Sequence, residues 1–438
     1  MAGACLAALA VSLAPAAAQT EPSEPPLKPP SVQAASAILV DAATGTVLFE
    51  KDARTRRPMA STTKIMTATM ILESGRLGEA VTFSEKARHT PYANFNAAPG
   101  ESVPMQDLLY AIMLRSSNDG CVAAAEHLSG SAAAFAQQMT SRARELGAAD
   151  TNFVTTNGLY AKEHYSTAYD LALMTRHAIQ YPLFNQVVAT KSYKLNRSKN
   201  TKDLVVTNHN KFLGKYQGAD GVKTGYVRQS GRCLVASATH QEAGHPWRLI
   251  AVVLNSGDTY GDSTALMEWG KQNFQPVFFA KAGETVALAS VDGGSRESVP
   301  LVPERDLTAV IRRIPGKNIE RSIQLASEMR APVTQRQVGG KLVGLVDGRP
   351  VAEVPLVATG AVGRVWLAGM APWTGWTLVL AAVALGPRYA RSIASRAARR
   401  AAGSSPGASG TAAKSTRRRR RGVAARRRTA DYDWESYS

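Results

Sequence analysis

Residues 58–67 read Pro-Met-Ala-Ser-Thr-Thr-Lys-Ile-Met-Thr and contain the only Ser-x-x-Lys sequence in the chain, at Ser61 and Lys64. The apolar spacing that follows predicts a helix over residues 61–72, so that Ser61 and Lys64 share one face. A serine hydroxyl is a weak nucleophile until a base takes its proton, and a desolvated lysine amine can be that base. The stretch therefore predicts a nucleophile and its base at a helix start, where the helix dipole favours negative charge.

The sequence on either side predicts a sheet built from both ends of this region. Residues 37–40 and 46–50 are typical of a β-hairpin, and strand-like stretches return at 231–238 and 249–254. The helices that we expect between and after these strands are 105–115, 123–128, 131–146, 168–180 and 265–274. Strands that open and close a helical region indicate an α+β layer fold.

A second polar motif, Ser116-Ser117-Asn118, follows an apolar helix and lies 55 residues after Ser61. A hydroxyl and an amide two residues apart on a turn can both point into a cleft, where Ser116 could relay a proton and Asn118 could fix Lys64. The alternative is a plain polar turn, because serine and asparagine favour turns in any case.

The third motif is Lys223-Thr224-Gly225, 162 residues after Ser61. A glycine in a strand lets the backbone approach a ligand closely, while Lys223 and Thr224 offer a cation and a hydroxyl to an anionic group. Lys223 would also help to keep Lys64 deprotonated. The alternative is an exposed edge strand with a routine lysine.

Together and in this order, the three motifs resemble the signature of the penicilloyl serine transferases. The flanking residues are similar to the D-alanyl-D-alanine carboxypeptidases of low-molecular-mass penicillin-binding type. The matching stretches are 58–67, Ser116-Ser-Asn-Asp, Asn157-Gly-Leu, Tyr165-Ser-Thr-Ala and Asp220-Gly-Val-Lys-Thr-Gly-Tyr. The resemblance covers about residues 32–279 and implies a β-lactamase/transpeptidase-like catalytic domain at 33–279, with an antiparallel sheet and helices.

The resemblance also implies an activity and a set of site residues. The activity is release of the terminal D-Ala from peptidoglycan stem peptides ending in D-Ala-D-Ala, and covalent binding of β-lactam antibiotics such as penicillin, with no metal or organic cofactor. The implied catalytic residues are Ser61, Lys64 and Ser116, and the implied substrate-binding residues are Asn118, Lys223, Thr224, Gly225 and Tyr226. The backbone N–H groups of Ser61 and Tyr226 would form the oxyanion hole.

Two other functions share these motifs. A serine β-lactamase needs a base for fast deacylation, and no glutamate is placed convincingly for that role in the sequence. A catalytically idle penicillin-binding or wall-binding protein would tolerate the loss of site residues, whereas every position of the three motifs is present here.

Beyond the catalytic region the composition changes. Residues 281–360 contain short β-rich pieces separated by glycine and proline turns, which predicts a small β-sandwich domain. At the other end, residues 1–18 are apolar and finish in three alanines, as expected for a cleavable secretory signal peptide. Residues 19–32 contain five prolines and read as an extended linker.

The C-terminal region predicts a membrane anchor. The 23 positions between Arg364 and Arg388 are uncharged, which is long enough for a transmembrane helix at 365–386. Tryptophans gather at its start and arginines follow it, so we expect the catalytic domain on the extracytoplasmic side of the cell membrane. An interfacial helix is the alternative.

The basic charge of the protein is concentrated in this C-terminal tail. The whole chain has a formal charge of +18, and the tail at 387–438 holds 14 basic and three acidic residues. Stop-transfer arginines explain such a tail, so we expect no nucleic-acid partner.

Cysteine and histidine usage limits the remaining possibilities. Of three cysteines, Cys5 lies in the signal segment, so a disulfide scaffold is excluded. Cys121 and Cys233 read as two buried free thiols, with a disulfide between them as the alternative. No His-Glu-x-x-His or Cys-x-x-Cys spacing is present, which argues against a zinc site.

Overall fold

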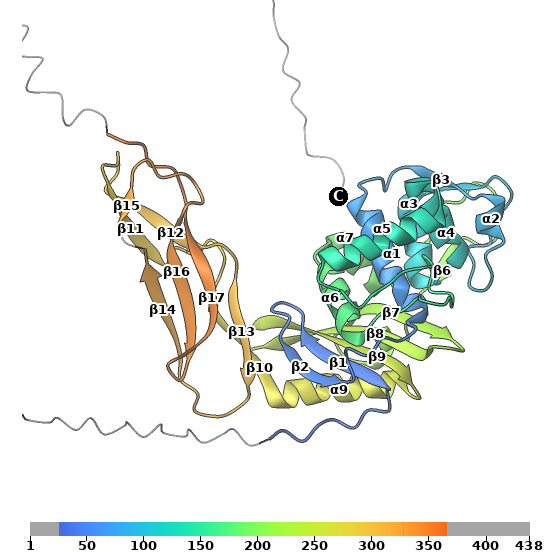
Figure 1. The fold of residues 1–438 in the computed structure, drawn as a ribbon, viewed down its shortest axis with the longest axis horizontal. Coiled ribbons are helices and arrows are strands. Elements are labelled where there is room, and N and C mark those ends of the chain that lie inside the picture. Colours follow the sequence, from blue (N-terminus) through green and yellow to red (C-terminus); the bar gives the residue numbers. More distant parts are fainter. Residues whose placement is uncertain (1–25, 327, 366–438) are drawn as a thin grey trace, which may run out of the picture. The chain divides into compact units, whose positions relative to one another are not determined.

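The computed structural model describes residues 26–326 and 328–365. Its first part is built on a five-stranded antiparallel sheet with the order β2-β1-β9-β8-β7 (Figure 1). The strands are β1 Ser36–Asp41, β2 Val47–Lys51, β7 Ala219–Val227, β8 Gly231–Glu242 and β9 His245–Ser256. The N-terminal hairpin therefore pairs with the last strand of the region through β1 and β9. This confirms the α+β fold with a sheet built from both ends.

Helices cover both faces of this sheet. α9, Thr259–Asn273, lies along one face, and the remaining larger helices lie on the other (Figure 1). These are α1 Lys64–Glu73, α3 Met105–Leu114, α4 Asn118–Ser129, α5 Ala132–Glu145, α6 Ala168–Ala178 and α7 Pro182–Ala189. Because side chains alternate along a strand, Leu39 of β1 packs in the α9 core while Ile38 packs in the helical core on the opposite face.

Short elements join the helices at the edge of this region. They are β3 Ala80–Thr82, α2 Glu85–Arg88, β4 Ser102–Pro104, β5 Ser192–Lys194, β6 Val205–Thr207 and α8 Phe212–Lys215. β3 pairs with β4, and β5 pairs with β6, so each pair closes a loop against the helical core. The loops that they close carry several of the residues that contact the candidate site.

The β-rich region forms a second folded part with its own core. A six-stranded sheet has the order β14-β16-β17-β12-β11-β15, and a two-stranded sheet pairs β10 with β13. The strands are β10 Phe274–Ala280, β11 Ala287–Asp292, β12 Ser298–Pro303, β13 Leu307–Arg312, β14 Ile319–Leu325, β15 Met329–Arg330, β16 Val338–Val346 and β17 Arg349–Ala358. Phe279 of β10 and Leu356 of β17 lie in one core, so the two sheets pack on each other. Bridges at Val333–Val362 and Gly294–Arg364 extend the strand pairing to residue 364.

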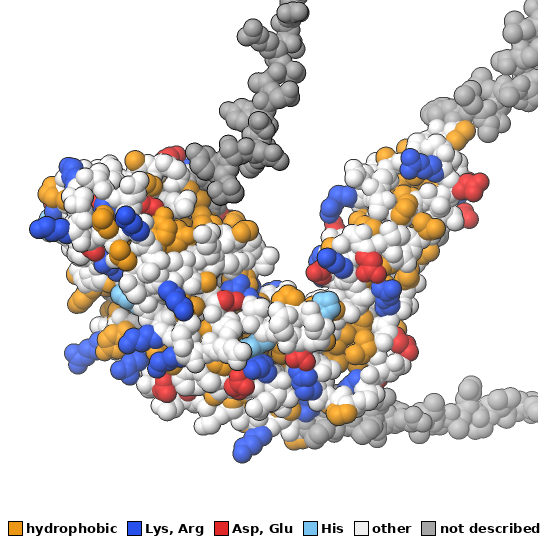
Figure 2. All heavy atoms as spheres, turned by 180° about the vertical axis from the view of Figure 1, so that it is seen from behind, with side chains coloured by type: hydrophobic (Ala, Val, Ile, Leu, Met, Phe, Trp, Pro, Cys, Tyr) orange, Lys and Arg blue, Asp and Glu red, His pale blue; other side chains and the backbone are white. Residues whose placement is uncertain are grey.

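The structure also bears on the thiols, the surface charge and the membrane. Cys121 and Cys233 are both free and buried, as expected for structural thiols. On the face drawn in Figure 2, basic and acidic side chains are interspersed.

No helix within residues 26–326 and 328–365 combines the length and apolarity needed to cross a bilayer. The segments expected to be a signal peptide (1–18), a membrane anchor (365–386, except residue 365) and a basic tail (387–438) lie outside the described residues.

Candidate active site

Ser61 and Lys64 meet at the start of α1. Ser61 lies in a short 3₁₀ turn, Ala60–Thr63, and Lys64 is the first residue of the α-helix. The Lys64 Nζ lies 2.9 Å from the Ser61 Oγ, so the expected contact between nucleophile and base is present. Ala60 has a φ of +49°, and a Cβ on Gly158 would lie only 1.9 Å from the Ala60 carbonyl oxygen. The turn that presents Ser61 therefore requires a glycine packed directly against it.

The Lys64 amine is completely enclosed. Its side chain has no solvent exposure, and its Nζ also donates to the Asn118 Oδ1 at 2.8 Å and to the Asn157 carbonyl oxygen at 2.5 Å. Burial lowers the pKa of Lys64 to about 8, although the Cys121 thiol and the Asp119 carboxylate oppose this change. A substantial fraction of Lys64 is therefore neutral near pH 8, as a general base must be.

The Ser116–Asn118 motif forms the second wall of the site. Ser116 is buried with a φ of +68°, a strained conformation for a non-glycine residue. The Ser117 Oγ accepts a hydrogen bond from the Gly120 N–H and caps α4, and Asn118 is the first residue of that helix. This cap places the Asn118 amide oxygen against Lys64, which confirms the contact expected from sequence.

The third wall is β7, which lies at one edge of the sheet. A Cβ on Gly225 would lie 2.9 Å from the Ser61 amide nitrogen, so the strand passes close to the nucleophile turn. Lys223 is buried, and its Nζ donates to the Thr224 carbonyl oxygen at 3.0 Å. Burial, and then the positive charge of Lys64, lower the pKa of Lys223 to about 7. The effect of this pair of amines therefore falls on Lys223, whereas the pKa of Lys64 is lowered by its own burial.

The two remaining motif residues lie on the same strand beside Gly225. Thr224 is half-buried, whereas the Tyr226 side chain is 67% exposed. Tyr226 pairs with Arg232 of β8, which fixes its backbone within the sheet. The sheet therefore fixes its backbone N–H next to Gly225, while its side chain points to solvent.

A loop at residues 91–101 packs against the start of α4. The Asn118 N–H donates to the Ala93 carbonyl oxygen, and the Asn118 Nδ2 donates to the Pro91 carbonyl oxygen at 3.0 Å. The Phe95 N–H donates to the Asp119 carboxylate at 2.7 Å. These bonds join the loop to the motif that holds Lys64.

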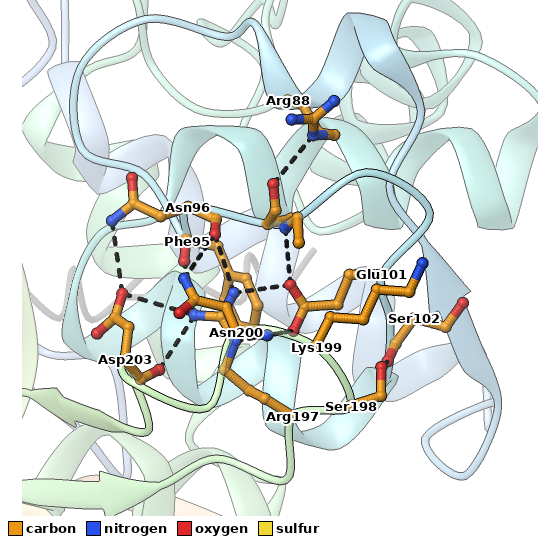
Figure 3. Close-up of polar contacts among 12 residues, drawn as sticks. Arg88, Phe95, Asn96, Glu101, Ser102, Arg197, Ser198, Lys199, Asn200 and Asp203 are labelled. Atoms are coloured by element: carbon orange, nitrogen blue, oxygen red, sulfur yellow. Dashed lines mark hydrogen bonds and ion pairs between the residues drawn. The ribbon is translucent and has the colours of Figure 1, made fainter.

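Arg197 anchors this loop from the segment 197–203 (Figure 3). Its guanidinium forms an ion pair with Glu101 at 2.9 Å, and neither side chain is exposed. It also donates to the Phe95 and Asn96 carbonyl oxygens and stacks 4.0 Å from the Phe95 ring. Burial opposes ionisation of Glu101, but the hydrogen bonds from Arg197 hold the pKa of this carboxyl below its ordinary value.

Two residues at the site lie outside the three motifs. Asn157 belongs to one of the stretches that resemble the family, but its contact with Lys64 is made by a backbone carbonyl, which any residue could supply. His164 is buried, with its Nε2 2.9 Å from the Thr63 Oγ1 and its Nδ1 3.0 Å from the Val154 nitrogen. Burial, and then the charge of Lys64, lower the pKa of His164 to about 4. Within the described parts of the chain, no cluster of three His, Cys, Asp or Glu side chains is arranged to hold a metal ion.

Comparison with known proteins gives a consistent result. Residues 20–258 match the D-alanyl-D-alanine carboxypeptidase family model, and residues 274–364 match the C-terminal domain of penicillin-binding protein 5. D-alanyl-D-alanine carboxypeptidase DacA of Escherichia coli is 34% identical over 346 residues, which is 75% of this chain and 83% of that protein. The corresponding enzyme DacF of Bacillus subtilis is 31% identical over 336 residues, 74% of this chain and 85% of its own. The crystal structure of penicillin binding protein 5 from Haemophilus influenzae superimposes with a TM-score of 0.65 at 30% identity, covering 77% of this chain and 100% of that one.

Proposed function

The chain belongs to the D-alanyl-D-alanine carboxypeptidase family of serine peptidases, and on this premise we propose that it removes the terminal D-Ala from peptidoglycan stem peptides through an acyl-enzyme on Ser61. The observation that carries this proposal is the 2.9 Å contact between the Lys64 Nζ and the Ser61 Oγ. In this contact a fully buried amine with a lowered pKa meets a hydroxyl at a helix start.

In the first step, Lys64 takes the hydroxyl proton as the Ser61 Oγ attacks the carbonyl carbon of the penultimate D-Ala. The carbonyl oxygen becomes an oxyanion, which the N–H groups of Ser61 and Tyr226 would stabilise. Removing one such donor costs about 3 to 4 kcal/mol in other enzymes. The close approach of Gly225 to the Ser61 nitrogen supports this placement, because it brings the backbone segments that carry the two N–H groups into contact.

In the second step the peptide bond breaks and the terminal D-Ala leaves as an amine. Its nitrogen needs a proton, and Ser116 would relay the one that Lys64 has accepted. Asn118 holds the Lys64 amine between the two hydroxyl-bearing segments through its 2.8 Å hydrogen bond. Water then attacks the ester with Lys64 again as base, which frees Ser61.

The terminal carboxylate of the substrate would bind along β7. Thr224 offers a hydroxyl, and Lys223 in its protonated form provides an attractive field beside it. A β-lactam places its amide carbonyl and its carboxylate at a comparable separation, so the same groups would direct its acylation of Ser61. No cofactor takes part in any of these steps.

A test must separate this activity from that of a serine β-lactamase and from an idle binding protein. Asp119, the carboxylate whose charge acts on Lys64, is buried and accepts hydrogen bonds from the Phe95 and Gly120 N–H groups and the Ser117 hydroxyl, which argues against a role as deacylation base. Mass spectrometry of the protein with penicillin, and with a tripeptide ending in D-Ala-D-Ala, should give a long-lived adduct and release of D-Ala. Rapid penicillin turnover would indicate a lactamase, and neither product would indicate an idle protein.

We further place the protein at the cell membrane, with the catalytic region and the β-rich region, which begins with β10 at residue 274, as two extracytoplasmic domains. The uncharged stretch 365–386 would be the anchor, the tail 387–438 would lie inside, and 1–18 would be removed after export. Cell fractionation tests this: the full chain should sediment with membranes, and a chain ending at Arg364 should be soluble with unchanged D-Ala release. Membrane association of the shorter chain would contradict the anchor.

A further inference from the structure

His164 lies between two segments that contact Lys64, one at its backbone and one at its amine. One is the nucleophile turn, Ala60–Thr63, which leads into Lys64 itself. The other is the segment 154–157, whose Asn157 carbonyl oxygen accepts from the Lys64 Nζ. The imidazole contacts both segments and is 3% exposed.

The hydrogen bonds around the ring define which nitrogen carries the proton. The Val154 and Thr155 N–H groups both donate to the Nδ1, at 3.0 and 3.3 Å, so this nitrogen must be unprotonated. The proton of the neutral ring is then on the Nε2, which faces the Thr63 Oγ1 at 2.9 Å. The Thr63 hydroxyl in turn donates to the Ala60 carbonyl oxygen at 2.8 Å.

A continuous relay of hydrogen bonds results, from the 154–155 backbone through His164 and Thr63 to the Ala60 carbonyl. Every donor in it meets one acceptor, and every member is buried except part of the 154–155 backbone. The Ala60 carbonyl is the same group that packs against Gly158. The relay therefore fixes the distance between the nucleophile turn and the carbonyl that orients Lys64.

We propose that His164 is a positioning residue for acylation: as a neutral imidazole it links Thr63 to the 154–157 segment and so holds the Asn157 carbonyl and the Ser61 turn at a fixed separation around Lys64. This inference rests on the proposed function for its kinetic consequences. The positive charge of Lys64 on α1 acts on the ring, and Phe153 packs against it edge to face. A ring that stays neutral in this environment does not exchange protons during turnover, which separates its role from that of Lys64.

A double-mutant cycle on the full-length protein tests the link. His164→Asn keeps an acceptor for the 154–155 N–H groups but is too short to reach Thr63, and Thr63→Val removes the hydroxyl without loss of volume. Each change should lower the rate constant for acylation by penicillin about 10-fold or more, and the two together no further than about 2-fold beyond the larger single effect. Multiplication of the two single effects would overturn the proposal.

Two variants provide the controls. Thr63→Ser keeps the hydroxyl and should restore acylation to within about 3-fold of the unmodified protein. Thr69→Val removes a buried hydroxyl from α1, where it bonds the Ile65 carbonyl and no site residue, and should leave acylation within about 2-fold.

For D-Ala release, His164→Asn should lower kcat with an unchanged KM, because the relay orients the base and does not touch the substrate. An equal loss in Thr69→Val, or a rise in KM alone, would contradict a positioning role.

A spectroscopic measurement decides the arrangement independently of activity. In protein labelled with ¹⁵N at its seven histidines, the His164 ring should show the Nε2–H tautomer and no titration between pH 5 and pH 8. An Nδ1–H tautomer, or a midpoint near pH 6.5, would overturn the relay. Absence of both penicillin acylation and D-Ala release in the unmodified protein would instead refute the proposed function, and the ring signals would still decide the relay.

Discussion

A Cβ added to Gly225 would lie 2.9 Å from the amide nitrogen of Ser61, a separation that real Cβ atoms do not adopt. The edge strand and the nucleophile turn are therefore in direct backbone contact. The proposed oxyanion hole needs the N–H that follows Gly225 and the N–H of Ser61 at one place, and this contact brings the two backbone segments together.

We expect Gly225→Ala to lower the rate of penicillin acylation by about 100-fold or more, because the new methyl group must displace the Ser61 turn or the strand. The matched control is Gly214→Ala, where an added Cβ meets nothing within 4 Å. Stopped-flow acylation measures both. Equal rates in the Gly225 variant and the unmodified protein would show that the oxyanion is bound elsewhere.

The lowered pKa of Lys64 predicts a pH dependence of both activity and stability. Acylation should rise with pH through an apparent pKa near 8, as the neutral amine forms. The folded protein binds this proton less tightly than the unfolded chain does, so the free energy of unfolding should also increase as pH rises above about 7. For a folded pKa of about 8, the gain between pH 7 and pH 9 is about 1 kcal/mol.

Lys64→Met separates this contribution from those of other groups. The variant should lose acylation by about 10²- to 10⁴-fold and remain folded, because methionine fills a similar volume without the charge. Its urea unfolding curves at pH 7 and pH 9 should show the stability gain reduced by about 1 kcal/mol. An unchanged difference between the two pH values would mean that Lys64 keeps an ordinary pKa.

The buried pair of Arg197 and Glu101 should contribute strongly to stability. Glu101→Gln leaves a buried guanidinium without its counter-charge, and such changes cost about 3 to 5 kcal/mol. The control is Arg56→Gln, which breaks an ion pair with Asp150 that is about half exposed, and because solvent screens such a pair this change should cost far less. Equal unfolding free energies for these two variants would contradict an anchoring role for Arg197 in the 91–101 loop.

For the substrate carboxylate, Thr224→Val should raise KM and lower kcat/KM for a D-Ala-D-Ala peptide by about 10- to 150-fold. This corresponds to the loss of one hydrogen bond to a charged group, about 1.5 to 3 kcal/mol. The equivalent change Thr308→Val, at a strand position of similar burial in the β-rich domain, should leave both constants unchanged. If Thr224→Val behaves like this control, the carboxylate is held by other groups.

Much of the fold could be predicted because its signals are local. The hairpin at 37–50 and the helix that begins near Ser61 follow from alternating and helical patterns. The predicted helix at 123–128 was too short, because Asn118, Asp119 and Gly120 are poor helix formers that the Ser117 cap brings into α4. Three-residue strands such as β3 and β5 carry too little pattern to be recognised alone.

Helix and strand ends near the domain boundary were less predictable for a similar reason. α9 begins at Thr259 instead of Ala265 because Asp258 caps it by accepting from the Gly261 N–H at 3.0 Å. The end of the first region was expected near residue 279, but residues 274–280 form β10, which pairs with β13. That pairing partner lies more than 25 residues further along the chain, beyond the reach of a local pattern.

The residues of the candidate site were likewise predictable only where a local sequence pattern marks them. Side chains with chemical roles, such as Ser61, Lys64 and Asn118, lie in short motifs whose order is informative. The groups that orient them were not predictable, because the Asn157 contribution is a backbone carbonyl and His164 acts from 100 residues beyond Lys64. Such contacts exist only after the chain has folded.

The acylated residue is the most direct test of the account. After reaction of the full-length protein with penicillin, proteolysis and mass spectrometry should locate the added mass on the peptide that contains Ser61. Ser61→Ala should show neither the adduct nor D-Ala release, because no other side chain in the site can form the ester. An adduct on a different residue, or labelling that persists in Ser61→Ala, would contradict the assignment of Ser61 as the nucleophile.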